Sequence, residues 1–254
     1  MRFLAWIDGR VVEAKELPSS EPFVMQRIHT LNHTVYNAYA HIDVLRETSG
    51  ELFGFQTLAS GGDVERIVAK LLDVANAPLS CSVPVVMRIY ASGALSFEVE
   101  QPMFGEGVYL RAKRPTGVAI ERAPLVTLAP TSESEAAEAM AERSVYHMGG
   151  DVALWVDGEG NLISHPWRPL FVYHKGYLFT PKEYSSVEYI SAVAAINSAN
   201  MKLVVRNIPS RALESVEEIF LVDIMGVSSL ANIRRHRLLS SIALRIANRM
   251  EPQS

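Results

Sequence analysis

Short apolar runs separated by turn residues fill the segment 152–181. The runs are rich in β-branched and aromatic side chains, and clusters containing glycine lie between them. This arrangement is typical of strands joined by tight turns. The segment therefore predicts three short strands, which are Ala153–Val156, Leu170–Tyr173 and Tyr177–Thr180.

The same reading predicts strands elsewhere in the chain. Arg2–Ile7 and Arg10–Glu13 flank Asp8-Gly9, a dipeptide that favours the turns found in hairpins. Further alternating or apolar runs predict the strands Phe23–Tyr36, Val83–Tyr90, Leu95–Val99, Gly107–Lys113, Leu125–Leu128, Lys202–Asn207 and Ile219–Val222.

Apolar residues at helical spacing predict five helices and one shorter turn of helix. Asp63 is the expected cap of the second helix, and Ser185 or Ser186 that of the fourth. The expected helices are Ala38–Thr48, Val64–Ala75, Ser132–His147, Ser185–Ala199 and Arg237–Met250, with a short helix or turn at Arg211–Val216.

Strands and helices in this order predict an α+β fold in two halves. We expect an N-terminal α+β domain at 1–114 and a C-terminal α/β domain with a hairpin-rich sheet at 123–254. Pro115-Thr116-Gly117 reads as a crossover, so 115–122 is the expected linker.

The composition and net charge of the chain limit the classes of partner that it is expected to bind. The 254 residues carry a net charge of −4, which disfavours nucleic acid and anionic membrane surfaces. The N-terminus reaches Asp8 too early for the apolar region of a signal peptide, so no signal peptide is expected. The sequence has no long apolar stretch, so no membrane span is expected. Cys81 is the single cysteine; it fits a reducing cytoplasm and is expected to be a small buried side chain.

No catalytic motif emerges from the residues alone. His29, His33 and His41 could share a metal ion, but no carboxylate or cysteine spacing completes a site, so solvated or hydrogen-bonded histidines are expected. The basic run Arg234–Arg237 is expected to be the solvated start of the last helix, with an anion or partner contact as the alternative.

Eight short segments, taken in order, resemble one family. They are Ala5–Val12, His41–Leu45, Gly149–Leu154, Asp157–Gly160, Leu170-Phe171, Leu178–Pro181, Val216–Leu221 and Gly226-Val227. Their order and spacing are similar to the class IV, or fold-type IV, pyridoxal-phosphate enzymes, which include branched-chain and D-amino-acid aminotransferases and aminodeoxychorismate lyases. The resemblance implies a two-domain D-amino-acid aminotransferase-like fold and a homodimer.

The functional positions of that family fall on unsuitable residues here. No lysine occurs from Leu125 to Asp151, where the Schiff-base lysine of the family is expected. The position of the family's lysine is Thr131, that of the acid that pairs with the pyridine nitrogen is Ser164, and that of the family's asparagine is Pro169. The position of the phosphate-binding arginine is Val44, with Arg46 nearby. The phosphate cradle corresponds to Ser185, Ser186, Val187 and Glu188.

A Schiff base needs an amine, and a phosphate needs cations or N–H donors. The resemblance therefore implies a class IV protein without catalytic residues, a pseudoenzyme or small-molecule binder for which no cofactor is expected. Any surviving pocket would be lined by hydroxyl groups, with Arg46 as a possible anion contact. Two alternatives stay open: an active pyridoxal-phosphate enzyme using a shifted lysine, with Lys182 as the fallback beside Lys175 and Lys202, or a dimeric scaffold protein.

Overall fold

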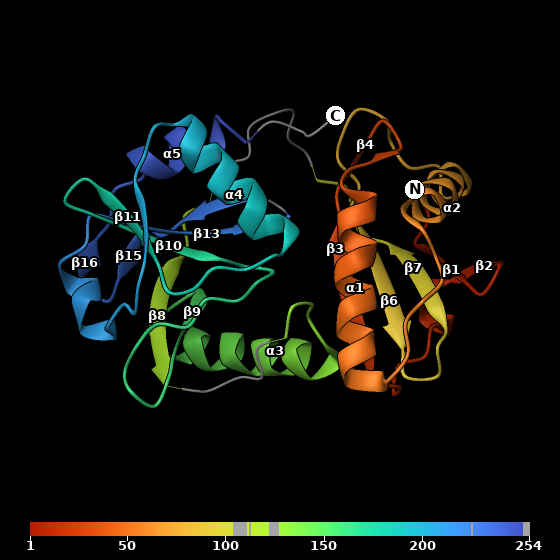
Figure 1. Ribbon diagram of the computed structural model, residues 1–254, viewed down its shortest axis with the longest axis horizontal. Helices are drawn as coiled ribbons and strands as arrows, with labels where there is room; N and C mark the ends of the chain where they lie inside the picture. Colours follow the sequence, from red (N-terminus) through yellow and green to blue (C-terminus); the bar gives the residue numbers. More distant parts are fainter. Residues whose placement is uncertain (104–110, 112, 122–126, 225, 251–254) are drawn as a thin grey trace. The chain divides into compact units, whose positions relative to one another are not determined.

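A computed structural model gives the fold of the chain in two compact units, each of which is described by itself (Figure 1). The first unit combines the described residues of 1–107 with 127–133, and the second holds most of the remainder. The described residues are 1–103, 111, 113–121, 127–224 and 226–250.

The first unit is built on an antiparallel sheet in the order β2-β1-β7-β6-β3. Helices α1 and α2 pack together and against this sheet. Its elements are β1 (Leu4–Ile7), β2 (Arg10–Glu13), the short 3₁₀ turn Ala14–Glu16, β3 (Phe23–Ile28), β4 (Thr30–Leu31), β5 (Thr34–Val35), α1 (Ala38–Phe53), α2 (Gly61–Val74), β6 (Val85–Tyr90) and β7 (Leu95–Val99).

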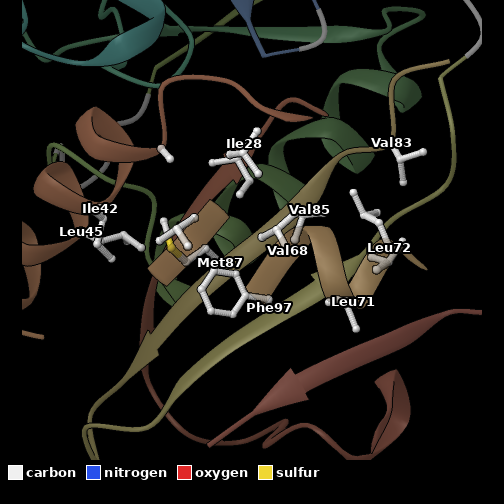
Figure 2. Close-up of a cluster of buried hydrophobic side chains, with 14 of the residues drawn as sticks. Ile28, Ile42, Leu45, Val68, Leu71, Leu72, Val83, Val85, Met87 and Phe97 are labelled. Atoms are coloured by element: carbon white, nitrogen blue, oxygen red, sulfur yellow. The ribbon is translucent and has the colours of Figure 1, made fainter. Parts of the chain in front are cut away.

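Apolar side chains from both helices and the sheet form the core of this unit (Figure 2). Leu45 of α1 and Leu72 of α2 are fully buried, as are Met87 and Phe97 of the sheet. Burying each large apolar side chain contributes about 1.5–3 kcal/mol. The apolar faces of the two predicted amphipathic helices therefore pack on the sheet and form the core with it.

The helix ends differ from the predicted ones for local reasons. Helix α1 passes through Gly50 and ends at Phe53, followed by the cap residue Gly54, whose φ of 75° suits a residue without a side chain. Helix α2 begins after Ser60, whose side chain accepts a hydrogen bond from the Asp63 backbone N–H. Asp63, the predicted cap, instead completes the capping box from the third helical position.

The described residues of the second unit form two sheets and three α-helices. One sheet has the order β12-β11-β10-β13-β14 and the other β16-β15-β8-β9. Its elements are β8 (Thr116–Glu121), α3 (Ser132–His147), β9 (Val152–Val156), β10 (Leu170–His174), β11 (Tyr177–Thr180), α4 (Val187–Ser198), β12 (Leu203–Val205), the 3₁₀ turn Ser210–Glu214, β13 (Glu218–Asp223), β14 (Gly226–Ser229), β15 (Asn232–Ile233), β16 (His236–Arg237) and α5 (Ser241–Ala247).

Parts of the second unit differ from the predicted elements or lie outside the described residues. Strand β8 (Thr116–Glu121) lies within the predicted linker 115–122 and pairs in parallel with β9, so the described residues of this segment form a strand of the second unit. The run Arg234–Arg237 turns a hairpin between β15 and β16, and helix α5 starts only at Ser241, so the predicted helix start is wrong. Most of the predicted strand Gly107–Lys113 and half of Leu125–Leu128 lie outside the described residues.

The central prediction for the second unit is confirmed. Strands β9, β10 and β11 lie where the apolar runs of 152–181 placed them, and β10 pairs antiparallel with β11. Cys81 is buried, also as expected. Within the described part of the chain, no helix is both long and apolar enough to cross a membrane.

Candidate functional site

Two segments of the second unit that carry predicted site residues are joined by side-chain hydrogen bonds. The first is the loop 162–169, which carries Ser164. The second is the segment 184–186, which precedes α4 and carries Ser186. The Tyr184 hydroxyl donates to the Ser164 carbonyl, and the Ser186 hydroxyl donates to the Pro166 carbonyl at 2.5 Å. The structure thus brings Ser164 and Ser186, two of the predicted pocket positions, onto adjoining segments.

Both hydroxyl groups are engaged within the protein. Ser164 is buried and its Oγ accepts a hydrogen bond from the Leu170 backbone N–H at 2.9 Å. Ser186 is fully buried and caps α4 by accepting from the Tyr189 N–H at 3.3 Å. These hydroxyls therefore hold the loop and the helix start in place.

The other predicted positions in this unit range from buried Pro169 to exposed Ser185 and Lys182. Ser185 is exposed, and Val187 is the half-buried first residue of α4. Pro169 accepts a backbone hydrogen bond from the Val222 N–H at 3.0 Å. Lys182 is exposed, and its Nζ lies 5.6 Å from the centre of the Tyr184 ring.

A buried acid follows Ser186 in the first turn of α4. Glu188 is 7 % exposed, and its Oε2 has no hydrogen-bond partner among the described residues. Burial, with the nearby Asp223 carboxylate as a smaller cause, raises the pKa of Glu188 to about 8. Glu188 therefore keeps its proton and is neutral at neutral pH. It cannot replace the cation that a phosphate group needs at this position.

An arginine-rich contact lies at the end of strand β13. The Arg111 guanidinium donates to Asp223 Oδ1 at 2.7 Å, and Arg168 Nε lies 4.0 Å from Asp223 Oδ2. Arg168 precedes β10, opposite Asp223 in the extension of the β10–β13 pairing. The sequence alone does not reveal this cluster, because its members lie far apart in the chain.

The remaining predicted positions belong to the first unit. Thr131 is buried and forms an isolated antiparallel bridge with Val24. Val44 is part of the hydrophobic core. Arg46 donates to the carbonyls of Thr57 and Ala59 at 3.3 and 2.8 Å, and also to Asp43. These partners occupy the guanidinium group, which argues against the anion contact expected for it.

The histidines have separate hydrogen-bond partners, as the default interpretation expected. His41 Nδ1 lies 2.7 Å from Gln26 Oε1, and burial lowers the pKa of His41 to about 3. His29 Nδ1 lies 2.8 Å from the Ser82 hydroxyl, and His33 Nδ1 lies 2.7 Å from Asp73. No group of three or more potential metal ligands occurs among the described residues.

Comparison with known proteins shows which proteins share this fold. A scan against models of protein families and a search of curated protein sequences each found no match. Solved structures do match over nearly the whole chain. A branched-chain aminotransferase from Thermoproteus uzoniensis has 18% identity and a TM-score of 0.79, with 97% of this chain and 93% of that chain covered. An aminotransferase from Brucella abortus bound to the cofactor PLP has 15% identity and a TM-score of 0.81, with 98% of each chain covered.

A third structure gives the same result. It is the branched-chain amino acid aminotransferase of Escherichia coli, at 13% identity and a TM-score of 0.77, with 97% of this chain and 92% of that chain covered. The chain has the class IV aminotransferase fold. The predicted α+β, fold-type IV architecture is therefore confirmed.

One expectation drawn from the resemblance is contradicted. The substitutions at the family positions led us to expect no cofactor. The structural neighbours include the Brucella abortus complex with PLP and a branched-chain amino acid aminotransferase complexed with N-(5'-phosphopyridoxyl)-L-glutamate, so this fold points to pyridoxal phosphate.

The residues at the predicted positions do not fit the covalent mode in which the family holds this cofactor. Ser164 supplies a neutral, already bonded hydroxyl, and no acid stands at this position. Glu188 introduces a buried acid with an unpartnered oxygen beside the expected phosphate cradle.

Proposed function

We propose that this chain is a class IV aminotransferase-like protein that binds a small molecule without forming a Schiff base, and that it is a pseudoenzyme. The observation that carries the proposal is Thr131 at the position expected for the lysine, because a hydroxyl group cannot form a Schiff base. Pyridoxal phosphate or a chemically similar phosphorylated ring is the ligand class that the fold suggests.

The alternative of an active enzyme with a shifted lysine has less support. Lys175, Lys182 and Lys202 are all exposed. Catalytic amines that attack carbonyl groups are activated by desolvation or by a neighbouring cation. Lys182 and Lys202 instead lie over the rings of Tyr184 and Tyr177 at 5.6 and 5.4 Å.

Paired ligands test the proposal. Pyridoxal 5'-phosphate and pyridoxine 5'-phosphate differ in that an alcohol replaces the aldehyde, so only the first can form a Schiff base. Isothermal titration of the full chain should give affinities within about threefold of each other, a difference of under ~0.7 kcal/mol. A preference of more than about tenfold for the aldehyde, about 1.4 kcal/mol, would refute binding without a Schiff base.

Failure of both ligands to bind would separate the two parts of the proposal. It would contradict the assigned ligand class and favour the scaffold protein. Binding of both ligands with equal affinity, together with no transfer of an amino group from a panel of amino acids, would support the pseudoenzyme.

We also propose a homodimer in the cytoplasm. The support is the class IV resemblance for the dimer and the single, buried Cys81 for a reducing compartment. Light scattering on the purified chain should give about twice the monomer mass of 28.1 kDa. A monomer at all measured concentrations would contradict the dimer.

A further inference from the structure

A small cavity lies in the second unit, between α3, strands of both sheets and the loop 162–169. Its volume is about 20 Å³. One water molecule needs about 10–15 Å³ of such space, so the cavity has room for one water and not for a ring or a phosphate group. Its polar lining comes from Glu138, His165 and Arg168, and its apolar lining includes Trp155, Leu170 and Leu221.

Two of the lining side chains carry buried polar atoms without a hydrogen-bond partner among the described residues, although Arg168 Nε lies 4.0 Å from Asp223 Oδ2. His165 is 5 % exposed, and neither Nδ1 nor Nε2 has a hydrogen-bond partner among the described residues. Arg168 Nε is also buried and without a hydrogen-bond partner in the same part of the chain. Leaving a buried donor or acceptor unsatisfied costs about 1–3 kcal/mol, so two such side chains on one cavity point to a missing partner.

Neighbouring aromatic rings fix the direction of the imidazole. Trp167 stacks on the His165 ring with centroids 4.8 Å apart, and Trp155 meets it edge-on at 5.9 Å. Trp167 Nε1 donates to Glu138 Oε1 at 3.1 Å, which ties this stack to α3. The imidazole therefore cannot readily turn to another partner.

The charges around the cavity select a neutral occupant. The cations Arg111 and Arg168 balance the carboxylates Asp223 and Glu138, and Arg111 is bonded directly to Asp223. Burial, together with the charge of Arg168, lowers the pKa of His165 to about 4, so its ring is neutral at pH 7. A neutral imidazole presents one donor and one acceptor, and Arg168 Nε–H presents a donor.

We propose that this cavity binds one buried water molecule that bridges Arg168 Nε and a ring nitrogen of His165. Water fits because it accepts from the arginine and either donates to or accepts from the imidazole, whereas a halide only accepts and a metal cation would oppose Arg168. The bridge fixes the loop 162–169 from within. This loop also carries Ser164, so the water supports the segment that holds this predicted site residue.

A crystal structure of the full chain at high resolution, with and without a bromide soak, tests the site. We expect a density peak within hydrogen-bonding distance of Arg168 Nε and one nitrogen of His165, with no anomalous signal from bromide. An empty cavity would overturn the proposal, and an anomalous peak at the site would show an anion and overturn it equally.

Oxygen-17 relaxation dispersion gives a solution test by counting long-lived buried waters. The variant Arg168→Met removes the donor and keeps much of the side-chain volume, so it should hold one such water fewer than the wild type. His147→Phe, on the exposed end of α3, should leave the count unchanged. An unchanged count in folded Arg168→Met would contradict the bridge; if that variant fails to fold, the wild-type crystal structure decides.

Discussion

Replacing Glu188 with glutamine tests the buried acid at the start of α4. Glutamine keeps the shape of the side chain and cannot ionise. In the folded chain the pKa of Glu188 is raised to about 8 from its ordinary value of 4.5, so the folded state holds a proton that the unfolded state releases between these values. The contribution of Glu188 to the stability of the wild type therefore falls as pH rises from 4.5 to 8.

The size of the effect follows from that interval. About 3.5 pH units at about 1.4 kcal/mol each give about 5 kcal/mol of stability lost by Glu188 above pH 8, with less if water reaches the ionised carboxylate. The Glu188→Gln variant lacks this loss. At about pH 5 it should match the wild type within about 1 kcal/mol, and at about pH 9 it should be more stable by several kcal/mol.

Urea unfolding followed by tryptophan fluorescence measures this difference, because Trp155 and Trp167 both belong to the second unit. Glu183→Gln is the matched control, since Glu183 is exposed on the same segment. Its stability should stay within about 0.5 kcal/mol of the wild type at both pH values. A Glu188→Gln variant with the same pH dependence as the wild type would refute the reasoning.

Three further predictions concern local structure. Ser186→Ala should cost about 1–3 kcal/mol of unfolding free energy, since it removes the α4 cap and the bond to the Pro166 carbonyl, whereas Ser185→Ala at the exposed neighbour should change it by under about 0.5 kcal/mol; equal effects in urea unfolding would contradict this. Gly150→Ala should lower the melting temperature, since its Cβ would lie 2.4 Å from a valine methyl carbon, whereas Gly158→Ala meets nothing within 4 Å; calorimetry showing no difference between them would be contrary evidence. Burial lowers the pKa of His41 to about 3, so the unfolded chain binds the proton first; the Glu188→Gln variant, which lacks the opposing titration of Glu188, should therefore lose stability as pH drops below about 6.5, and a flat stability profile of that variant down to about pH 4 would oppose this.

Strong local signals explain which elements the sequence predicted well. Ser132–His147 was predicted at its observed bounds, because serines precede its first turn and Gly149-Gly150 follow its end. Strand β8 was missed because its partners β9 and β15 lie far along the chain, and because Pro115-Thr116-Gly117 looks like a turn.

The site was predictable only where it depends on chain neighbours. The cap of α4 at Ser186 could be anticipated from its position before an apolar helix. The engagement of Arg46 could not, because its carbonyl partners at Thr57 and Ala59 come from a loop that folds back on α1. The burial of Glu188 likewise depends on tertiary packing, since acids at helix starts are usually solvated.

Mapping of covalent adducts tests the central claim, a class IV fold without a Schiff-base lysine, most directly. The full chain is mixed with one equivalent of pyridoxal 5'-phosphate and reduced with borohydride, and its peptides are analysed by mass spectrometry. We predict that no lysine carries a stoichiometric pyridoxyl group. Stoichiometric labelling of one lysine, such as Lys182, would contradict the account and support an active enzyme with a shifted lysine.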